Sequence, residues 1–221
     1  MRLAVLTWNL YHGRAIPPAD RDLLPDFAAA LAGWNWDLAL LQEVPPWWPR
    51  ELAHAAGAEQ RLVMTSRNQL LPVRRLLAIR RPDLMRSGGG GCNAILARGT
   101  TIAEHRRLRL CRLPEQRWLH AIRLASGIWA ANLHATAHDS ARAAREAAQA
   151  SAATLSWAAG APAVLGGDFN LRRLELDDWD HAGGHDVDHI FVSGPAPTSQ
   201  AHTLDHGSLS DHAPVMVTLE G

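Results

Sequence analysis

The sequence predicts an α/β fold in which two packed sheets are covered by helices. Apolar runs typical of strands alternate with helical segments in the first and last thirds of the chain, and the middle third consists mostly of strands. The 221 residues are 47% apolar, which is enough for a sizeable core. Since no linker rich in Pro, Gly or Ser divides the chain, we expect a single domain over residues 1–221.

The strands are predicted from apolar runs that end at Gly, Pro, Asn or Ser. The pairs Gly99-Thr100 and Ser126-Gly127 predict tight turns between neighbouring strands of the middle block. The expected strands cover residues 2–9, 36–43, 92–98, 101–110, 116–124, 127–134, 162–167, 187–193 and 213–219.

The clearest predicted helix covers residues 138–159. Asp139 or Ser140 can cap its first turn, and an alanine-rich body follows to Gly160. Further helices are expected at 20–33, 47–57 and 69–81.

The chain has the composition of a cytoplasmic protein. It lacks the roughly 18 consecutive apolar residues of a membrane span. Its N-terminus passes directly into a strand without the pattern of a secretory signal. Cys92 and Cys111 are too few for a disulfide framework. We therefore expect a cytoplasmic monomer without stable membrane association.

The net charge of zero conceals a strong asymmetry. All 22 basic residues are arginines, and 13 of them lie in residues 67–123 beside three acids. Residues 124–221 hold four arginines and 12 acids. A GC-rich genome explains arginine in place of lysine, but it does not explain the clustering. A basic segment beside an acidic one suits an enzyme that holds a polyanion against a metal site.

The segment 166–170 (GGDFN) follows an apolar run and carries the most informative residues. Asp168 and Asn170 point to the same side of an extended strand end. The acid can accept a proton or bind a metal, while the amide can hydrogen-bond an oxyanion without adding negative charge. We expect the preceding glycines to bend the backbone and let a substrate approach. A tight turn stabilised by side-chain bonds, the ordinary interpretation of this string, is compatible with catalysis.

Further polar residues end other apolar runs, namely Asn9, Glu43, His134, Asp211 and His212. Carboxylates, amides and imidazoles gathered at strand ends are typical of metal-assisted phosphate chemistry. The sequence therefore predicts a phosphoester hydrolase.

Six segments, in this order, resemble motifs of the endonuclease/exonuclease/phosphatase superfamily. That superfamily includes pancreatic-type deoxyribonuclease, abasic-site endonucleases, neutral sphingomyelinases and inositol polyphosphate phosphatases. The resemblance implies a four-layer α/β/β/α sandwich of two packed mixed sheets flanked by helices. The segments are 7–10 (TWNL), 41–44 (LQEV), 132–135 (NLHA), 166–170 (GGDFN), 188–192 (DHIFV) and 210–215 (SDHAPV).

The resemblance also implies a divalent ion, Mg²⁺ or Mn²⁺, bound through Glu43 and Asp211 with Asn9 supporting the ligand shell. Carboxylate oxygens suit such hard cations. In the same comparison, Asp168 orients and deprotonates the attacking water, and Asn170 holds the scissile phosphate.

The histidine roles follow from the same resemblance. His212 is expected to contact the phosphate while Asp188 holds its other ring nitrogen, and His134 is expected to protonate the leaving oxygen. Asn132 is assigned to substrate binding. The sequence reveals no acid partner for His134, and His12 is interpreted as a surface residue.

A nucleic acid is the substrate that the sequence favours. Arginine binds phosphates without sequence preference, and the arginines between the second and third motifs lie where the superfamily carries substrate loops. Trp47 and Trp48 either stack on a base or pack the following helix. The arginines assigned to the substrate are Arg74, Arg75, Arg80 and Arg81.

Other activities suit the same residues. A phospholipid or sphingomyelin phosphodiesterase and a small-molecule phosphatase are the enzymatic alternatives. An inactive nucleic-acid-binding module is disfavoured, because every motif keeps its polar residues. The sequence does not decide whether the substrate is DNA or RNA, whether cleavage is endo- or exonucleolytic, or how many metal ions are bound.

Overall fold

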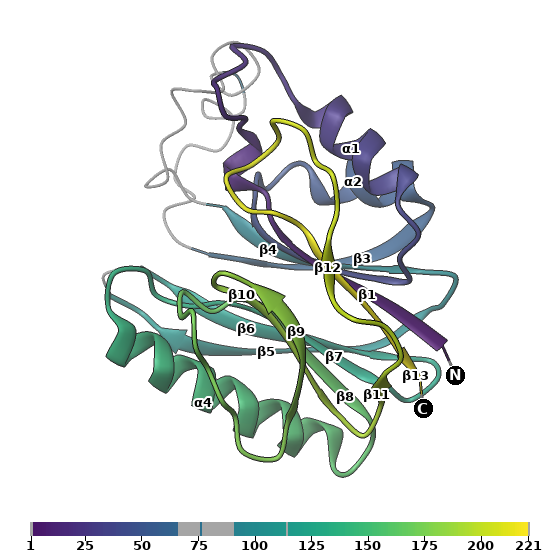
Figure 1. Cartoon of the computed structure of the whole chain (residues 1–221), viewed down its shortest axis with the longest axis vertical. Helices are drawn as coiled ribbons and strands as arrows, with labels where there is room; N and C mark the ends of the chain where they lie inside the picture. The colour runs from purple at the N-terminus through teal and green to yellow at the C-terminus, as the bar shows by residue number, and fades with distance from the viewer. Residues whose placement is uncertain (1, 66–75, 77–90, 114, 221) are drawn as a thin grey trace.

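The computed structural model describes residues 2–65, 76, 91–113 and 115–220. Two β-sheets pack face to face, α1 and α2 cover the outer face of one sheet, and α4 covers the outer face of the other (Figure 1). This arrangement confirms the predicted α/β/β/α sandwich. No helix among the described residues is long and apolar enough to cross a membrane.

The first sheet runs in the order β11-β13-β1-β2-β4-β3, with β12 also paired to β13. The neighbours β1 and β2 are parallel, while β13, β4 and β3 join antiparallel to their neighbours. Its strands are β1 (Arg2–Asn9), β2 (Leu38–Val44), β3 (Ala58–Met64), β4 (Cys92–Arg98), β11 (Ala196–Pro197), β12 (His202–Thr203) and β13 (Val215–Glu220).

The second sheet runs in the order β5-β6-β7-β8-β10-β9. Here β7 and β8 are parallel, and the other neighbours are antiparallel. Its strands are β5 (Ile102–Cys111), β6 (Arg117–Leu124), β7 (Trp129–His134), β8 (Ala163–Asp168), β9 (Asp180–His185) and β10 (Asp188–Ser193).

The helices begin and end where local signals place them. Asp139 caps α4, since its Oδ1 accepts a hydrogen bond from the backbone N–H of Arg142 at 2.9 Å. Gly57 ends α2 in the left-handed conformation, which glycine adopts without steric cost. The described helices are η1 (Tyr11–Gly13), α1 (Leu24–Gly33), α2 (Pro49–Ala56) and α4 (Ser140–Ala158).

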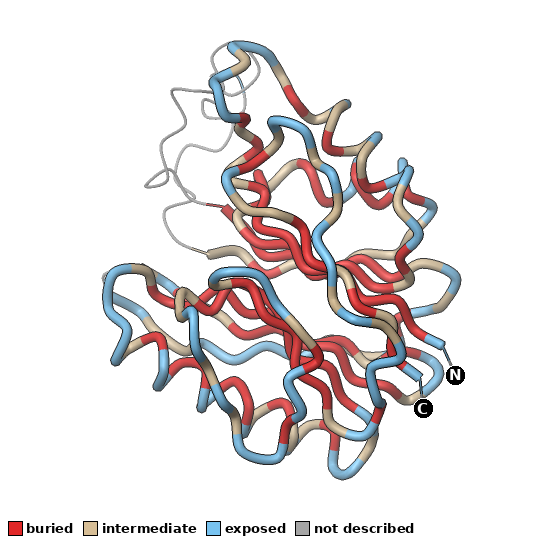
Figure 2. The backbone as a smooth tube through the Cα atoms, in the orientation of Figure 1, coloured by how far each residue is buried: buried red, intermediate tan, exposed pale blue. Residues whose placement is uncertain are grey.

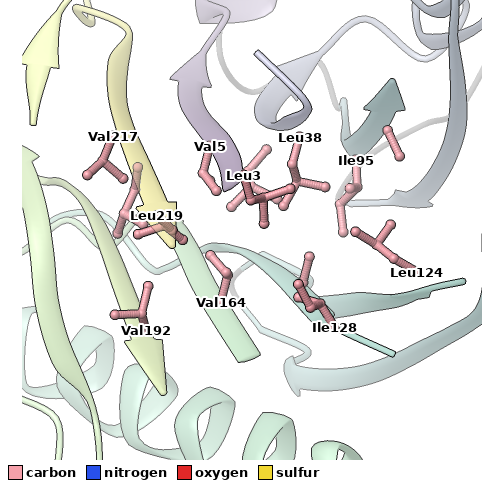
Figure 3. Close-up of a cluster of buried hydrophobic side chains, with 14 of the residues drawn as sticks. Leu3, Val5, Leu38, Ile95, Leu124, Ile128, Val164, Val192, Val217 and Leu219 are labelled. Carbon is pink, nitrogen blue, oxygen red and sulfur yellow. The ribbon is translucent and has the colours of Figure 1, made fainter. Parts of the chain in front are cut away.

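The core between the sheets is made of aliphatic side chains from both inner faces (Figure 3). Val5 and Leu38 of the first sheet and Val164 of the second are fully buried there. Figure 2 shows the buried residues concentrated along the strands, with exposed residues on loops and outer helix faces. The two sheets therefore form a firm support for the polar residues at their ends.

Two features of the sheets differ from the predicted elements, and one prediction stays untested. The turn at Gly99-Thr100 does not join neighbouring strands, because β4 and β5 belong to different sheets. The strands β3 and β9 were not expected; β9 contains the weak strand formers Asp180, Gly183 and Gly184, and its pairing with β10 compensates for them. Apart from Leu76, the helix expected over 69–81 lies outside the described residues.

Candidate active site across the ends of the two sheets

Strand register brings three predicted site residues together in the second sheet. Across the parallel pair β7–β8, His134 is level with Asp168. Across the antiparallel pair β8–β10, Asp168 is level with Asp188. All three are at least 94% buried, so an imidazole and two carboxylates meet at one end of the sheet, largely out of contact with water.

The two glycines before Asp168 serve packing, which corrects the expectation that they let a substrate approach. Gly167 has φ +143°, and a Cβ there would lie 1.9 Å from the carbonyl oxygen of Leu133. A Cβ at Gly166 would lie 2.7 Å from Leu40 of the facing sheet. Both glycines are buried in β8. They therefore let the catalytic strand fit closely between its neighbours.

The first sheet contributes Asn9 and Glu43 from the ends of its parallel strands. The Nδ2 of Asn9 donates a hydrogen bond of 2.9 Å to Oδ2 of Asp168, which links the two sheets. The Oδ1 of Asn9 accepts from the backbone N–H of Tyr11 at 2.9 Å. With both ends of its amide engaged, Asn9 holds Asp168 in place and keeps one oxygen lone pair for a further contact.

Asp168 lies at the centre of the site. Its Oδ1 accepts from the backbone N–H of Asn170 at 2.9 Å, and Asn170 adopts a left-handed φ of 52°. The Nδ2 of Asn170 donates to the carbonyl of Ala135 at 3.0 Å, which leaves its second proton for another acceptor. Burial raises the pKa of Asp168, while the positive charge of His212 and the hydrogen bond from Asn9 oppose that rise.

His212 and Asp188 form a close pair. The Nδ1 of His212 lies 2.7 Å from Oδ2 of Asp188. Burial alone would lower the pKa of His212, but the hydrogen bond and negative charge of Asp188 outweigh it and raise that pKa to about 9. The imidazolium is therefore the resident form at neutral pH. With Nδ1 engaged, Nε2 is free to face Asp168 Oδ2 and Asp211 Oδ1, each at 3.9 Å.

Contacts from β1 hold the loop that carries Asp211 and His212. The indole N–H of Trp8 donates to the carbonyl of His212 at 2.9 Å, and Trp8 is fully buried. The hydroxyl of Ser210 donates to the carbonyl of Asn9 at 2.6 Å and accepts from the N–H of His212 at 3.1 Å. The Thr7-Trp8-Asn9 motif thus fixes the position of the last motif of the chain.

His134 differs from His212 in charge. Burial lowers its pKa well below the ordinary value, and nearby Arg117 lowers it further. Its Nε2 lies 3.5 Å from Asp168 Oδ2 and 3.9 Å from Glu43 Oε1, so these two carboxylates are the acidic neighbours that the sequence did not reveal. The neutral imidazole can donate a hydrogen bond to a substrate oxygen.

Glu43 has the environment of a ligand for a divalent cation. Burial raises its pKa to about 7, and the negative charges of Asp168 and Asp211 contribute to that rise. A cation would relieve this excess of negative charge, and carboxylate oxygens are the donors that Mg²⁺ and Mn²⁺ prefer. Ligand atoms of Asp168, Asp188 and His212 also lie within 4.8 Å of one another. An ion at that second position would compete with the Asp188–His212 hydrogen bond.

Asn132 lies between the sheets instead of in the pocket. Its Nδ2 donates to the carbonyls of Leu41 and Ala94, both at 2.9 Å, and its Oδ1 accepts from Gln42 at 2.8 Å. The residue is fully buried. These contacts contradict the assignment of Asn132 to substrate binding and make it a polar link between the two sheets.

The site residues line a pocket of about 520 Å³. Several members were not expected from the sequence. Arg117 and Glu115 form an ion pair of 2.7 Å, and Arg117 is only 7% exposed. Nothing in the sequence distinguishes Arg117 from the other clustered arginines. The lining is Asn9, Tyr11, Glu43, Glu115, Arg117, His134, Thr136, Ala137, His138, Asp168, Asn170, Asp211 and His212.

His12 corrects the sequence interpretation most clearly. It was expected on the surface, yet its side chain is 8% exposed, and its Nε2 lies 3.1 Å from Oε2 of Glu43. Its position three residues after Asn9, just beyond the first motif and directly before Gly13, is the signal that could have indicated a role.

Two further predictions concern the substrate. Trp48 is 4% exposed and packs against Phe27 with ring centroids 5.3 Å apart, so it supports the helix layer and does not stack on a ligand. Trp47 is partly buried against the same core. The arginines Arg74, Arg75, Arg80 and Arg81 lie outside the described residues.

Comparisons with known proteins agree with this geometry. The endonuclease/exonuclease/phosphatase family profile matches residues 6–212. No curated protein matches the sequence. Among similar solved structures, an endonuclease/exonuclease/phosphatase from Beutenbergia cavernae has a TM-score of 0.71 and 16% sequence identity, and the match covers 99% of this chain and 71% of that one. TDP2 from Caenorhabditis elegans has a TM-score of 0.71 and 15% identity, with 100% of this chain and 76% of that one covered. A mannosyl-6-phosphatase from Bacteroides thetaiotaomicron has a TM-score of 0.71 and 17% identity, with 98% of this chain and 99% of that one covered.

The structural matches establish the fold, and the profile covers nearly the whole motif series from Leu6 to His212. The chain belongs to the endonuclease/exonuclease/phosphatase family.

Proposed function

We propose that this protein is a divalent-metal-dependent phosphodiesterase that hydrolyses nucleic acid. The observation that carries the proposal is the convergence of Glu43, Asp168 and His212, from three distant segments, on one pocket. A carboxylate pair beside a cationic histidine is the donor set that phosphoryl chemistry requires.

A bound Mg²⁺ or Mn²⁺ would be held by Glu43 and Asp211 and would neutralise charge on the phosphate. The protein's own residues divide the remaining work. Asp168, with its raised pKa, orients a water and takes its proton. The His212 imidazolium, fixed by Asp188, offers Nε2 to a phosphate oxygen.

Asn170 and His134 are assigned to other oxygens of the substrate. The free amide proton of Asn170 stabilises charge that develops on the phosphoryl oxygens. Because burial keeps His134 neutral, we assign it a hydrogen bond to the leaving oxygen. As the P–O bond breaks, that oxygen takes up a proton from solvent, and Asp168 later returns the proton of the attacking water to solvent.

Exposed arginines on β5 support a nucleic acid as the substrate. This strand forms the edge of the second sheet, and Arg106, Arg107 and Arg109 on it are exposed. After β5 the chain passes through Glu115 to Arg117, both of which line the pocket. A phosphate backbone that enters the pocket can therefore meet guanidinium groups outside it.

A phosphomonoesterase is the second candidate, favoured by the fold shared with the mannosyl-6-phosphatase over nearly the full length of both chains. A lipid substrate has less support, because Trp48 is buried in the helix layer and is not available for a membrane interface.

The proposal is tested with metal-stripped protein on plasmid DNA, single-stranded DNA, RNA, bis-p-nitrophenyl phosphate, sphingomyelin and a sugar 6-phosphate. We expect diester cleavage to vanish in EDTA and to return with Mg²⁺ or Mn²⁺. Turnover with metal shown to be absent would contradict metal dependence. Turnover of the sugar phosphate alone would favour the monoesterase.

A further inference from the structure

We infer that His12 is a positioning residue that fixes the Glu43 carboxylate in the orientation needed to bind the metal ion. The inference rests on the proposed function, in which Glu43 is a metal ligand. It begins with the contact between the two side chains. The Nε2 of His12 lies 3.1 Å from Oε2 of Glu43, with the side chains 8% and 17% exposed.

The two oxygens of Glu43 have different neighbours. His12 faces Oε2, whereas Nε2 of His134 lies 3.9 Å from Oε1. The close contact at Oε2 restricts rotation of the carboxylate about its last torsion, which keeps Oε1 on the side of His134. Residues that hold a metal ligand in this way contribute to metal affinity without touching the ion.

The backbone on both sides of this contact adopts unfavourable conformations. Tyr11 and His12 have φ values of 48° and 54°, and Glu43 has a φ of 50° at an irregularity in the β2–β4 pairing. Such left-handed conformations are unfavourable for residues other than glycine. Backbone strain of this kind persists where the surrounding structure requires it, and here it brings His12 and Glu43 together.

Two glycines hold the His12 ring in its place. A Cβ on Gly91 would lie 3.4 Å from Cε1 and Nδ1 of the ring, so the Gly91 backbone packs directly against it. On the other side of the turn, Gly13 has φ +75°, and a Cβ there would lie 2.3 Å from the buried Trp48. The turn therefore has little freedom to move away from Glu43.

A histidine that only filled space would not need this arrangement. An apolar residue would occupy the same volume without placing a polar nitrogen beside a buried carboxylate. The positioning role and the space-filling role predict different results for metal binding, and this difference defines the experiment.

The experiment measures the Kd for Mn²⁺ of the metal-stripped full-length protein by calorimetry, together with Tm in EDTA. We expect His12→Leu to raise the Kd at least 10-fold, within the 10- to 100-fold range typical of such residues. We expect Tm in EDTA to stay close to that of the wild type. His12→Gln, which keeps a polar group near the Nε2 position, should recover most of the affinity. His54→Leu is the matched control, since His54 is exposed on α2.

The outcomes separate this inference from the proposed function. An unchanged Kd in His12→Leu, with Glu43→Gln abolishing binding, would overturn the positioning role and leave the metal site intact. A wild-type protein that binds no Mn²⁺ would overturn both. Should His12→Leu fail to fold, Gly91→Val places methyl groups against the His12 ring, and an unchanged Kd in that variant would equally overturn the inference.

Discussion

At the scale of single residues, the site assigns opposite charge states to two histidines in one pocket. Asp188 raises the pKa of His212 to about 9, whereas burial keeps His134 neutral. Environments that separate the pKa values of like groups are a common way to divide catalytic roles. The pairing of His212 with Asp188, which favours the imidazolium, was expected from the resemblance, whereas the neutral state of His134 follows only from the packing around it.

Substitution of Asp168 and His212 tests the catalytic roles proposed for them. We expect Asp168→Asn and His212→Ala each to lower kcat by about 10²-fold or more, because each removes a group that acts in the transition state. The measurement is steady-state cleavage of bis-p-nitrophenyl phosphate, with circular dichroism as the check on folding. A folded variant that keeps the wild-type kcat would show that the residue has been assigned wrongly.

A third histidine, His120, should make the protein sensitive to acid. His120 is fully buried, and burial holds its pKa well below the ordinary value of 6.5, with His105 lowering it further. Below pH 6.5 the unfolded chain binds a proton at this position and the folded chain does not, so His120 lowers the free energy of unfolding as pH falls.

The variant His120→Leu removes this contribution. We expect its free energy of unfolding, relative to the wild type, to rise by about 1.4 kcal/mol for each pH unit below 6.5. Urea unfolding at pH 7.5, 6 and 5 measures the difference. Equal pH dependence in both proteins would contradict the prediction, and His202→Leu, at an exposed position, controls for the loss of a histidine.

At the scale of elements, α4 does more than cover the sheet. Its buried Glu146 accepts hydrogen bonds of 2.7 Å from both the backbone N–H and the hydroxyl of Thr136, which lines the pocket. The adjacent Ala135 carbonyl accepts from Asn170. A carboxylate in an alanine-rich helix thus holds the wall of the site.

Loss of that carboxylate should affect both stability and catalysis. Glu146→Ala leaves two buried donors without partners, and we expect the free energy of unfolding to fall by about 2–3 kcal/mol. We also expect a lower kcat, because Asn170 depends on the same wall. Gln149→Ala, at an exposed position of α4, should change neither quantity. Wild-type stability of Glu146→Ala by urea unfolding would refute the role.

The helices and strands that were predicted correctly are those whose own residues carry a clear local pattern. The Asp139 cap and the apolar run of β8 are readable because capping and burial leave clear residue patterns. By contrast, β9 is held by its partner and not by its own residues, and no pattern in a single sequence reports pairing of that kind. His12 was missed for a related reason, since its partner Glu43 lies in another strand.

At the scale of the whole molecule, the charge asymmetry should appear as a salt effect on substrate binding. The arginines Arg107 and Arg109 are exposed on the edge strand β5. If they contact a phosphate backbone, the double variant to Gln should raise KM on DNA and flatten the dependence of KM on salt. Turnover of bis-p-nitrophenyl phosphate should stay within about twofold of the wild type, because that substrate is too small to reach β5.

The matched control replaces Arg2 and Arg145, which are also exposed, with Gln. Equal changes in KM and in its salt dependence in both double variants would mean that net charge, and not the position of the arginines, determines DNA binding. An unchanged salt dependence in the β5 variant would remove the main structural support for a nucleic-acid substrate.

The overall architecture was predictable because the alternation of strands and helices indicated two packed sheets, and the resemblance carried by the motifs implied the four-layer sandwich. What the sequence could not supply was the contact between the sheets. Asn132 was assigned to a substrate, but its amide bonds to Leu41, Ala94 and Gln42 of the facing sheet. An asparagine next to a catalytic histidine looks the same in sequence whether it faces a ligand or a second sheet.

The hydrogen bond from Asn9 to Asp168 joins the side of the site proposed to bind the metal to the side proposed to activate water. Neither sheet alone holds all of the proposed reacting groups, so the proposed activity depends on how the two sheets pack against each other. A displacement of one sheet against the other would break the Asn9–Asp168 and Asn132 hydrogen bonds and would separate Glu43 from Asp168. The rate of turnover should therefore be sensitive to the packing of the two sheets, and we expect it to be lost before most of the core unfolds.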